Sequence, residues 1–266
     1  MMYSRSTLAL KYLRYYLQAS NGRGHGTHSP FVYHFIKKIL NDQQHYPDYE
    51  KVETLRRSLL GNRTLINVTD YGAGSALGGS NTRSIASLAR NAAKPAKFGQ
   101  LLYRMVRHYQ PKHILELGTS LGLTTAYFSL ANPDAHITTL EGAEEVSQIA
   151  SANFKQLQLQ NIVQVNGNFD NALPSVLDSM RTIDLAFIDG NHRKEPTLDY
   201  FLQLLPKVNN NSILIFDDIH WSRGMEEAWT AIKGHKDVHY SIDLFFIGIL
   251  FFRQEFREKQ DFVIRF

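Results

Sequence analysis

Acidic and polar side chains follow five short apolar segments of the chain, at the point where each segment ends. Carboxylates and imidazoles at such positions can bind a sugar hydroxyl, hold a divalent cation or accept a proton. Polar residues at or near these ends include Glu116, Glu141, Asn168, Asp189 and Asp217. Because the carboxyl ends of parallel strands meet at one edge of a sheet, we expect these residues to build a ligand site there.

The elements that must position these residues alternate between strands and helices. Short apolar runs predict strands at 113–117, 136–140, 161–165, 183–188 and 212–216. Helical periodicity lies between and after them, at 121–131, 143–157, 171–179, 195–204 and 223–233. This alternation indicates an α/β fold with a parallel sheet covered on both faces. Two final β-rich runs, 238–243 and 245–252, are too close for a crossover helix and predict an antiparallel hairpin.

A glycine-containing loop follows the first predicted strand. Gly118 and Gly122 allow a tight turn and the close approach of a ligand to the backbone at the start of the next helix. Ser120 and Leu123 stand where the dinucleotide-binding fingerprint requires glycine. The pattern is therefore E-x-G-x-x-x-G. The carboxylate of Glu116 would repel a pyrophosphate but attract a cationic ligand.

The next two strand ends predict how a nucleoside would be bound. Glu141 ends the second strand, and its carboxylate can accept two hydrogen bonds from a ribose diol. Phe169 follows the third strand and can stack on an adenine, with Asn168 or Asp170 accepting from the exocyclic amine. An adenosine that carries a positive charge and no phosphate is S-adenosylmethionine (SAM). The residues therefore predict SAM as the cofactor.

With these motifs in place, residues 97–253 resemble the class I SAM-dependent methyltransferases. Residues 187–192 and 215–220, and the preceding segment 94–100, look like the small-molecule O-methyltransferase branch of catechol and caffeoyl-CoA type. The resemblance implies a Rossmann-like, doubly wound sheet of seven strands with a terminal antiparallel hairpin. It also implies a SAM-binding domain over residues 91–266. Residues 1–90 fall outside the resemblance, and helical patterns in residues 1–65 predict a mainly helical extension or cap over residues 1–90.

The resemblance also implies roles for individual residues. The methionine end of the cofactor would be lined by Glu116, Gly118, Thr119, Ser120 and Gly122. Glu141 would bind the ribose, Asn168 and Phe169 would contact the adenine, and Asp189 would face the methyl group.

Three hypotheses account for how the acceptor hydroxyl would be activated. In the catechol-type branch two aspartates and an asparagine hold a divalent cation, which implies Asp189, Asp217 and Asp218 as ligands of Mg²⁺ or another divalent cation. Asp218 departs from that pattern, because the branch has asparagine there. Alternatively, His192 or His220 is a general base held by a neighbouring aspartate. In the third reading the aspartates only cap the following helix and the histidines take no part.

Two further features lie outside these motifs. A second glycine-rich loop, residues 71–81, mimics the cofactor loop, but no acid-ended strand follows it. We expect it to be a flap or a structural turn near the site. Trp221 and Trp229 flank the helix after the fifth strand and would either wall an acceptor pocket or pack in the core.

Composition excludes several classes of protein. The chain has no cysteine, which excludes a disulfide scaffold, a thiolate zinc site and a cysteine nucleophile. It has neither a membrane-spanning apolar run nor the apolar region of a secretory signal, so we expect a cytoplasmic protein. Residues 1–65 carry a net charge of +6, while the remainder carries −2. This basic quarter is consistent with a solvated helical face or with contact to an anionic surface.

We therefore predict an enzyme, a SAM-dependent methyltransferase that acts on a hydroxyl of a small molecule. One alternative is an RNA or protein methyltransferase that grips its substrate through the basic amino-terminal region. Residues 189–192 lack the N-P-P-[YF] signature of amino-methylating nucleic-acid enzymes, so a nucleic-acid partner is not expected. Another alternative is a SAM-binding module without catalysis. The aromatic-rich leader would supply a homodimer interface.

Overall fold

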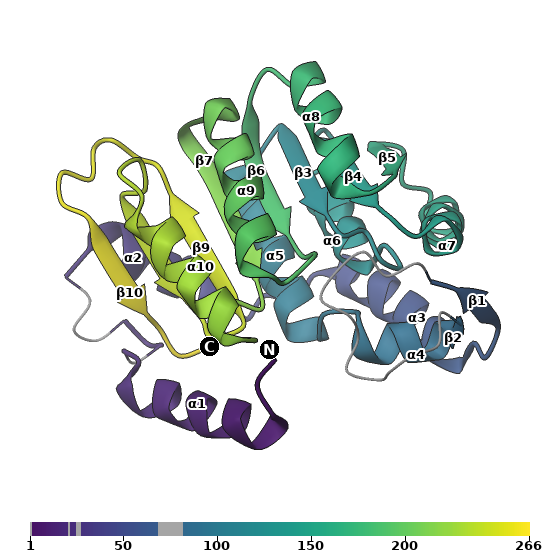
Figure 1. The fold of residues 1–266 in the computed structure, drawn as a ribbon, viewed down its shortest axis with the longest axis horizontal. Coiled ribbons are helices and arrows are strands. Elements are labelled where there is room, and N and C mark those ends of the chain that lie inside the picture. Colours follow the sequence, from purple (N-terminus) through teal and green to yellow (C-terminus); the bar gives the residue numbers. More distant parts are fainter. Residues whose placement is uncertain (1, 21, 25–27, 69–81) are drawn as a thin grey trace. The chain divides into compact units, whose positions relative to one another are not determined.

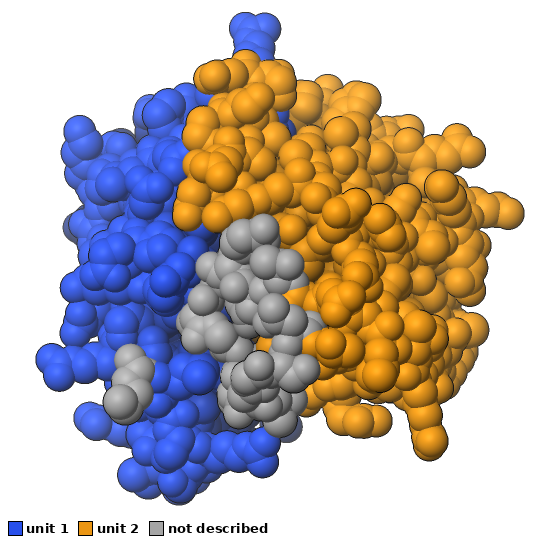
Figure 2. Space-filling model, turned by 45° about the vertical axis from the view of Figure 1, so that its right-hand side comes forward, with its two compact units in different colours: residues 1–42, 180–266 blue, residues 43–179 orange. Residues whose placement is uncertain are grey.

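The computed structural model describes the chain except residues 1, 21, 25–27 and 69–81. The chain divides into two compact units (Figure 2). The first comprises Met1–Asp42 and Met180–Phe266, and the second comprises Gln43–Ser179. The sequence-based boundary at residue 90 rests on where the methyltransferase motifs begin, which is a different criterion, and it stays a prediction. The second glycine-rich loop, predicted as a flap, lies outside the described residues.

The second unit carries three parallel strands and the helices that cover them (Figure 1). Its strands are β3 (His113–Leu117), β4 (His136–Glu141) and β5 (Ile162–Asn166), paired in that order. Its helices are α3 (Pro47–Gly61), α4 (Ile85–Asn91), α5 (Ala96–Tyr109), α6 (Leu123–Ala131), α7 (Glu144–Gln156) and α8 (Phe169–Ser179). A separate antiparallel pair joins β1 (Leu65–Asn67) and β2 (Thr82–Ser84).

The first unit begins with α1 (Arg5–Gln18), α2 (Pro30–Phe35) and a π-helical turn, η1 (Ile36–Leu40). After the second unit it continues through β6 (Ile183–Ile188), α9 (Lys194–Leu204), η2 (Leu205–Lys207), β7 (Val208–Asp217) and α10 (Arg223–Gly234). It ends with β8 (Tyr240–Asp243), β9 (Ile247–Phe251) and β10 (Gln260–Val263). β6 and β7 are parallel, and β8 and β9 form the predicted antiparallel hairpin, with β9 antiparallel to β7.

The predicted α/β fold is confirmed, with one correction to the strand count. Among the described residues, the second unit has three of these strands and the first unit has five, whereas seven were expected in all. The additional strand is β10, which pairs in parallel with β8 beyond the hairpin. Its burial alternates between half-buried and exposed side chains, so it lacks the continuous apolar run that marked the other strands.

The sequence accounts for these elements locally. β3 is almost wholly buried, as expected of a parallel strand that is covered on both faces. α5 buries one apolar face, which includes Phe98, Leu101, Leu102, Met105 and Val106. α1 and α10 each begin after a serine, Ser4 and Ser222, whose hydroxyl accepts a hydrogen bond from the first turn. No helix in the described part of the chain combines the length and the apolar character needed to cross a bilayer.

Candidate active site

The loop between β3 and α6 turns through three residues with left-handed backbone. Gly118, Ser120 and Gly122 have φ values of 106°, 48° and 77°. The loop is fixed to the end of β4, because the N–H groups of Gly118 and Thr119 donate to the Leu140 carbonyl at 3.0 and 3.1 Å. Helix α6 starts directly after Gly122, so the loop presents backbone at a helix amino terminus, as predicted.

Glu141, the last residue of β4, joins this loop directly. One carboxylate oxygen accepts the Ser120 N–H at 2.8 Å and the other accepts the Ala143 N–H at 3.0 Å. The half-buried carboxylate therefore holds the turn while part of it stays accessible. The structure brings together the two sequence motifs from which a nucleoside site was inferred.

Glu116 is placed differently from its neighbours in the motif. Its side chain is fully buried, and its Oε2 accepts hydrogen bonds from the hydroxyls of Thr125 and Thr139. The Thr139 hydroxyl also lies 2.6 Å from that of Thr119, so the base of the loop is a closed hydroxyl and carboxylate network. This burial gives Glu116 a role in holding the loop. Direct contact with a ligand stays a prediction.

The end of β5 is also tied to β4. The Gly167 N–H donates to the Glu141 carbonyl at 2.9 Å. The side chain of Asn168 accepts the Asp170 N–H at 3.1 Å, which starts helix α8. Phe169 is half-buried at the first position of that helix. The second unit thus holds every predicted cofactor residue except Asp189.

In the first unit, three potential metal ligands lie together. Asp189, His192 and Asp217 each offer one ligand atom, and these atoms all lie within 4.8 Å of one another. Strand pairing explains the grouping: Ile188 of β6 lies opposite Phe216 of β7, so both strands end at the same edge. Asp217 is buried, and the His192 ring lies 3.5 Å from the Asp189 carboxylate.

The predicted ligand set and this cluster share two of three members. His192, predicted as a base, takes the place of Asp218, which lies outside the cluster. Asp218 has a φ of 51°, and its N–H donates to the Phe246 carbonyl at 2.7 Å. Asn191 and His192 also have left-handed backbone. Such non-glycine residues are uncommon and concentrate at functional sites.

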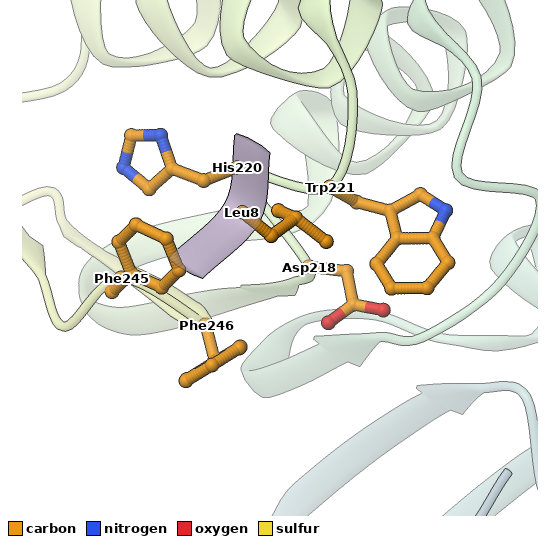
Figure 3. A pocket seen from close by; sticks show the side chains of 6 residues that line it. All are labelled: Leu8, Asp218, His220, Trp221, Phe245 and Phe246. Carbon is orange, nitrogen blue, oxygen red and sulfur yellow. The ribbon is translucent and has the colours of Figure 1, made fainter. Parts of the chain in front are cut away.

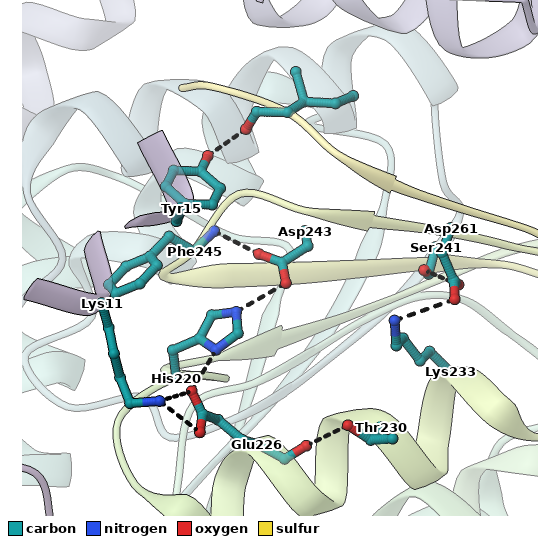
Figure 4. Close-up of polar contacts among 11 residues, drawn as sticks. Lys11, Tyr15, His220, Glu226, Thr230, Lys233, Ser241, Asp243, Phe245 and Asp261 are labelled. Carbon is teal, nitrogen blue, oxygen red and sulfur yellow. Dashed lines mark hydrogen bonds and ion pairs between the residues drawn. The ribbon is translucent and has the colours of Figure 1, made fainter. Parts of the chain in front are cut away.

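His220 has two carboxylate partners (Figure 4). Its Nδ1 lies 3.0 Å from Glu226 Oε1 and its Nε2 lies 2.8 Å from Asp243 Oδ2. Burial lowers the pKa of His220, but the hydrogen bonds and charges of Asp243 and Glu226 outweigh it and raise the pKa above its ordinary value. The predicted base role of His220 stays a prediction.

A small pocket opens beside the segment that follows β7 (Figure 3). It is lined by Leu8, Asp218, His220, Trp221, Phe245 and Phe246. Trp221 lines this pocket, and its place in an acceptor pocket stays a prediction. Trp229 takes the other alternative: it is buried, and a Cβ added at Gly248 would lie 2.6 Å from its ring.

Sequence reasoning missed three of the pocket residues. Phe245 and Phe246 were assigned only to a strand, and Leu8 belongs to a helix more than two hundred residues before them. Leu8 is one apolar residue in an amphipathic pattern, and nothing in its spacing marks it as part of a site.

Residues 115–219 match a family model described as a methyltransferase domain. Over 126 residues the chain is 30% identical to a catechol O-methyltransferase from Niastella koreensis. That match covers 46% of this chain and 55% of the relative, so the chain spans about half the length of the curated relative. The family model and this relative together confirm the resemblance predicted from the motifs.

Solved structures confirm the fold. An O-methyltransferase from Streptomyces achromogenes in complex with SAM superposes with a TM-score of 0.57 at 17% identity. It covers 79% of this chain and 91% of its own. A Podospora anserina methyltransferase bound to S-adenosylhomocysteine (SAH) superposes with a TM-score of 0.60 at 12% identity, covering 95% and 98%.

Proposed function

We propose that this chain, which carries a methyltransferase domain over residues 115–219, transfers the methyl group of SAM to a hydroxyl of a small molecule. One observation carries the proposal: Glu141 hydrogen-bonds the Ser120 N–H, so an acidic strand end and a glycine turn form one cradle. A carboxylate at that place suits a ribose and a positive charge, and it opposes a pyrophosphate. The catechol O-methyltransferase relative supports the same chemistry.

The cofactor would rest on the second unit. The backbone of Gly118, Thr119, Ser120 and Gly122 would line the methionine end, and Glu141 would bind the ribose diol. A carboxylate has about four lone-pair sites. Two backbone N–H groups occupy part of that capacity.

The adenine would lie on the ring of Phe169, beside Asn168. Stacking on an aromatic ring needs an accessible face, and Phe169 is only half-buried.

The reaction is an in-line displacement. The acceptor oxygen forms a bond to the methyl carbon while the carbon–sulfur bond breaks, and its electron pair stays on sulfur. The products are a methyl ether and SAH, and the hydroxyl proton leaves the acceptor. The protein's tasks are to align oxygen, carbon and sulfur and to favour the anionic acceptor.

Asp189, His192 and Asp217 fit a divalent cation, because two carboxylates and one imidazole lie within 4.8 Å of one another. When bound, such a cation would lower the pKa of the acceptor hydroxyl. Carboxylates suit Mg²⁺ and Mn²⁺, whereas an imidazole favours softer ions, so we expect Mn²⁺ to serve at least as well as Mg²⁺. Without a cation, the same atoms make His192 a base that Asp189 orients.

The acceptor would be a small aromatic molecule with a hydroxyl group. The curated relative is named for catechol, which supports an acceptor of this class. The predicted homodimer stays a prediction, which sedimentation of the full chain would test.

The decisive experiment combines calorimetry with SAH and transfer from labelled SAM to catechol. We expect SAH to bind and catechol to be methylated. Chelator should abolish turnover, and Mn²⁺ or Mg²⁺ should restore it. Full activity in chelator would remove the cation and leave His192 as the base. Methylation of RNA instead of catechol, or tight SAH binding with every acceptor inert, would replace the proposed function by one of its alternatives.

A further inference from the structure

Helix α1 has an apolar face that is exposed to solvent. Four of its large side chains are half exposed or more: Leu10 at 68%, Leu13 at 54%, Tyr16 at 47% and Leu17 at 69%. They lie three, four or seven residues apart, so they share one side of the helix, which we call the outer face of α1. Single exposed leucines are ordinary on a protein surface, whereas a row of them along one helix marks an interaction site.

The opposite face of α1 is held by the first unit. Tyr15 is buried, and its ring centroid lies 5.3 Å from that of Phe245. Lys11 Nζ lies 2.9 Å from Glu226 Oε1 on α10 (Figure 4). The helix is therefore fixed through its inner side, and the outer face is turned away from the unit that holds it.

An aromatic row continues the outer face beyond the helix. The rings of Tyr16 and Tyr12 have centroids 6.4 Å apart, and the Tyr12 centroid lies 5.9 Å from that of Phe246. Phe246 stands in the turn between β8 and β9 and is itself exposed. The apolar surface therefore reaches from α1 to the terminal hairpin.

Positive charge borders the outer face on both sides. Arg5 and Arg14 are exposed, and at 3.6 residues per turn they flank the four apolar side chains, one on each side. The Arg265 guanidinium lies 4.7 Å from the centroid of the Tyr16 ring. Residues 1–41 contain six lysines and arginines and no aspartate or glutamate. The surface is thus apolar in its middle and cationic at its border.

This combination selects among the possible partners. A symmetric interface with a second copy would place the same patch on both subunits, so arginines would face arginines, and α1 has no acidic residue to pair with them. RNA would be attracted by the charge, but leucine side chains offer its bases neither stacking nor hydrogen bonds. The outer face fits a partner that is anionic at its surface and apolar just beneath it.

We propose that α1 lies on the surface of an anionic lipid bilayer and inserts its outer face at the boundary between headgroups and acyl chains. Arg5 and Arg14 then lie at the level of the lipid phosphates, with their aliphatic stems in apolar surroundings. Amphipathic helices bordered by arginine or lysine bind in the plane of the membrane in this way, without spanning it. This role is independent of methyl transfer, so its tests need neither SAM nor an acceptor.

The first test is co-sedimentation of the full chain with vesicles. One set is an equimolar mixture of phosphatidylcholine and phosphatidylglycerol, and the other is phosphatidylcholine alone. We expect the mixture to bind at least about tenfold more tightly, because each arginine near an anionic membrane surface contributes about fivefold. Equal binding to both sets, or binding to neither, would overturn the proposal.

The double variant Leu10→Gln and Leu17→Gln tests insertion of the outer face. Binding to the mixed vesicles should weaken by about tenfold or more, because the inserted apolar area is lost. The urea midpoint should stay that of the wild type, since both leucines are exposed in the folded chain. Leu202→Gln is the matched control, because Leu202 is 55% exposed on α9 of the same unit. Equal binding by the double variant and this control would contradict insertion.

Arg14→Gln tests the charged border. It should weaken binding to the mixed vesicles by about fivefold and leave binding to phosphatidylcholine unchanged. Arg257→Gln removes the same charge from an exposed residue in the loop between β9 and β10, and it should bind as the wild type does. Equal losses in the two variants would mean that net charge, and not α1, directs the chain to the membrane.

A reporter at the centre of the outer face distinguishes the membrane from the other partners. The fluorescence that Leu13→Trp adds to the wild-type signal should be quenched by lipids brominated on their acyl chains, whereas that of Leu202→Trp should not. Equal quenching of the two would reject insertion through α1. If the wild type ignored vesicles but formed dimers or bound polyuridylate, and the double leucine variant lost that property, the outer face would belong to a second copy or to RNA and the proposal would be wrong.

Discussion

The loop after β3 and the segment after β7 both leave the carboxyl end of a buried parallel strand, yet they are held in different ways. The first loop, residues 118–122, is bound by the next strand along the chain, through Leu140 and Glu141. The second segment, residues 218–222, is bound by residues near both termini, which include Met2, Tyr3 and Phe246. The first is built from nearby sequence, and the second is assembled by the tertiary fold.

This difference suggests that the loop at residues 118–122 and the segment at residues 218–222 contact different ligands. A loop that its neighbouring strand fixes presents a constant backbone surface, which suits a cofactor that is the same in every reaction. A segment whose walls come from distant elements can change with each of those elements. We therefore expect substitutions in the first loop to affect folding and cofactor binding, and substitutions around the second to affect the acceptor.

The largest expected effect is that of Gly122→Ala, which tests whether the first loop tolerates any change. Its φ of 77° disfavours a side chain, and a Cβ there would lie 2.4 Å from a ring carbon of buried Phe154. Left-handed strain and overpacking together should lower the free energy of unfolding by about 2–5 kcal/mol in urea denaturation.

Gly234→Ala is the matched control for that substitution. Gly234 ends helix α10, and a Cβ there would meet nothing within 4 Å. It should stay within about 1 kcal/mol of wild type. If Gly122→Ala is as stable as this control, the loop at residues 118–122 tolerates a side chain. The contrast drawn between that loop and the segment after β7 would then be wrong.

The next largest effect concerns the cofactor itself. Glu141→Ala should weaken SAH binding by about 1.5–3 kcal/mol in calorimetry, because charged hydrogen bonds to the ribose would be lost. Glu144→Ala removes the same charge from the exposed first turn of α7 and should leave the affinity unchanged. Unchanged affinity in Glu141→Ala would mean that the ribose lies elsewhere. Denaturation of both variants separates lost contacts from an unfolded loop.

The same contrast explains what the sequence could predict of the fold. Strands β3 and β6 were predicted with their observed bounds, because continuous apolar runs mark strands that are buried on both faces. Strand β10 was missed, because its exposed edge residues carry no such run. Strand β5 is only partly buried, yet its run at 161–165 predicted it to within one residue, so the local rule fails only where the sequence carries no apolar run, as in β10.

In the candidate site, too, contacts between neighbouring motifs could be predicted, whereas contacts from distant elements could not. The association of Glu141 with the glycine turn follows from two motifs on adjacent strands. The partners of His220 do not, because Glu226 lies one helical turn beyond the loop and Asp243 lies on the hairpin. A histidine beside aspartates in sequence suggests a base, whereas its actual carboxylates come from other elements. Leu8 is the clearest example of this limit. An amphipathic pattern predicts which residues of a helix form its apolar face, but it does not predict which part of the protein that face packs against.

The smallest expected effect concerns Glu226, which links helix α1 to the segment after β7. It is tested through the pH dependence of the free energy of unfolding. Glu226 faces Tyr3, Lys11 and His220. Burial raises the pKa of Glu226, but hydrogen bonds from Lys11, Tyr3 and His220 outweigh it, and the pKa lies below its usual 4.5. The ionised carboxylate therefore stabilises the fold above that value, and the stabilisation is lost as the pH falls through the lowered pKa.

Glu226→Gln should accordingly be less stable than wild type by about 1 kcal/mol at neutral pH, a value discounted for partial exposure. The gap should shrink as the pH falls from about 7 to 3 in urea denaturation. Measurement below the usual pKa of Glu226 isolates this group, because His220 stays protonated throughout that range. Glu227→Gln, whose partners are Lys194 and Arg223, should leave hydrogen exchange in α1 at the wild-type rate. A gap that does not change with pH would show that Glu226 supports the segment after β7 by packing alone, so charge would not contribute to the attachment of α1.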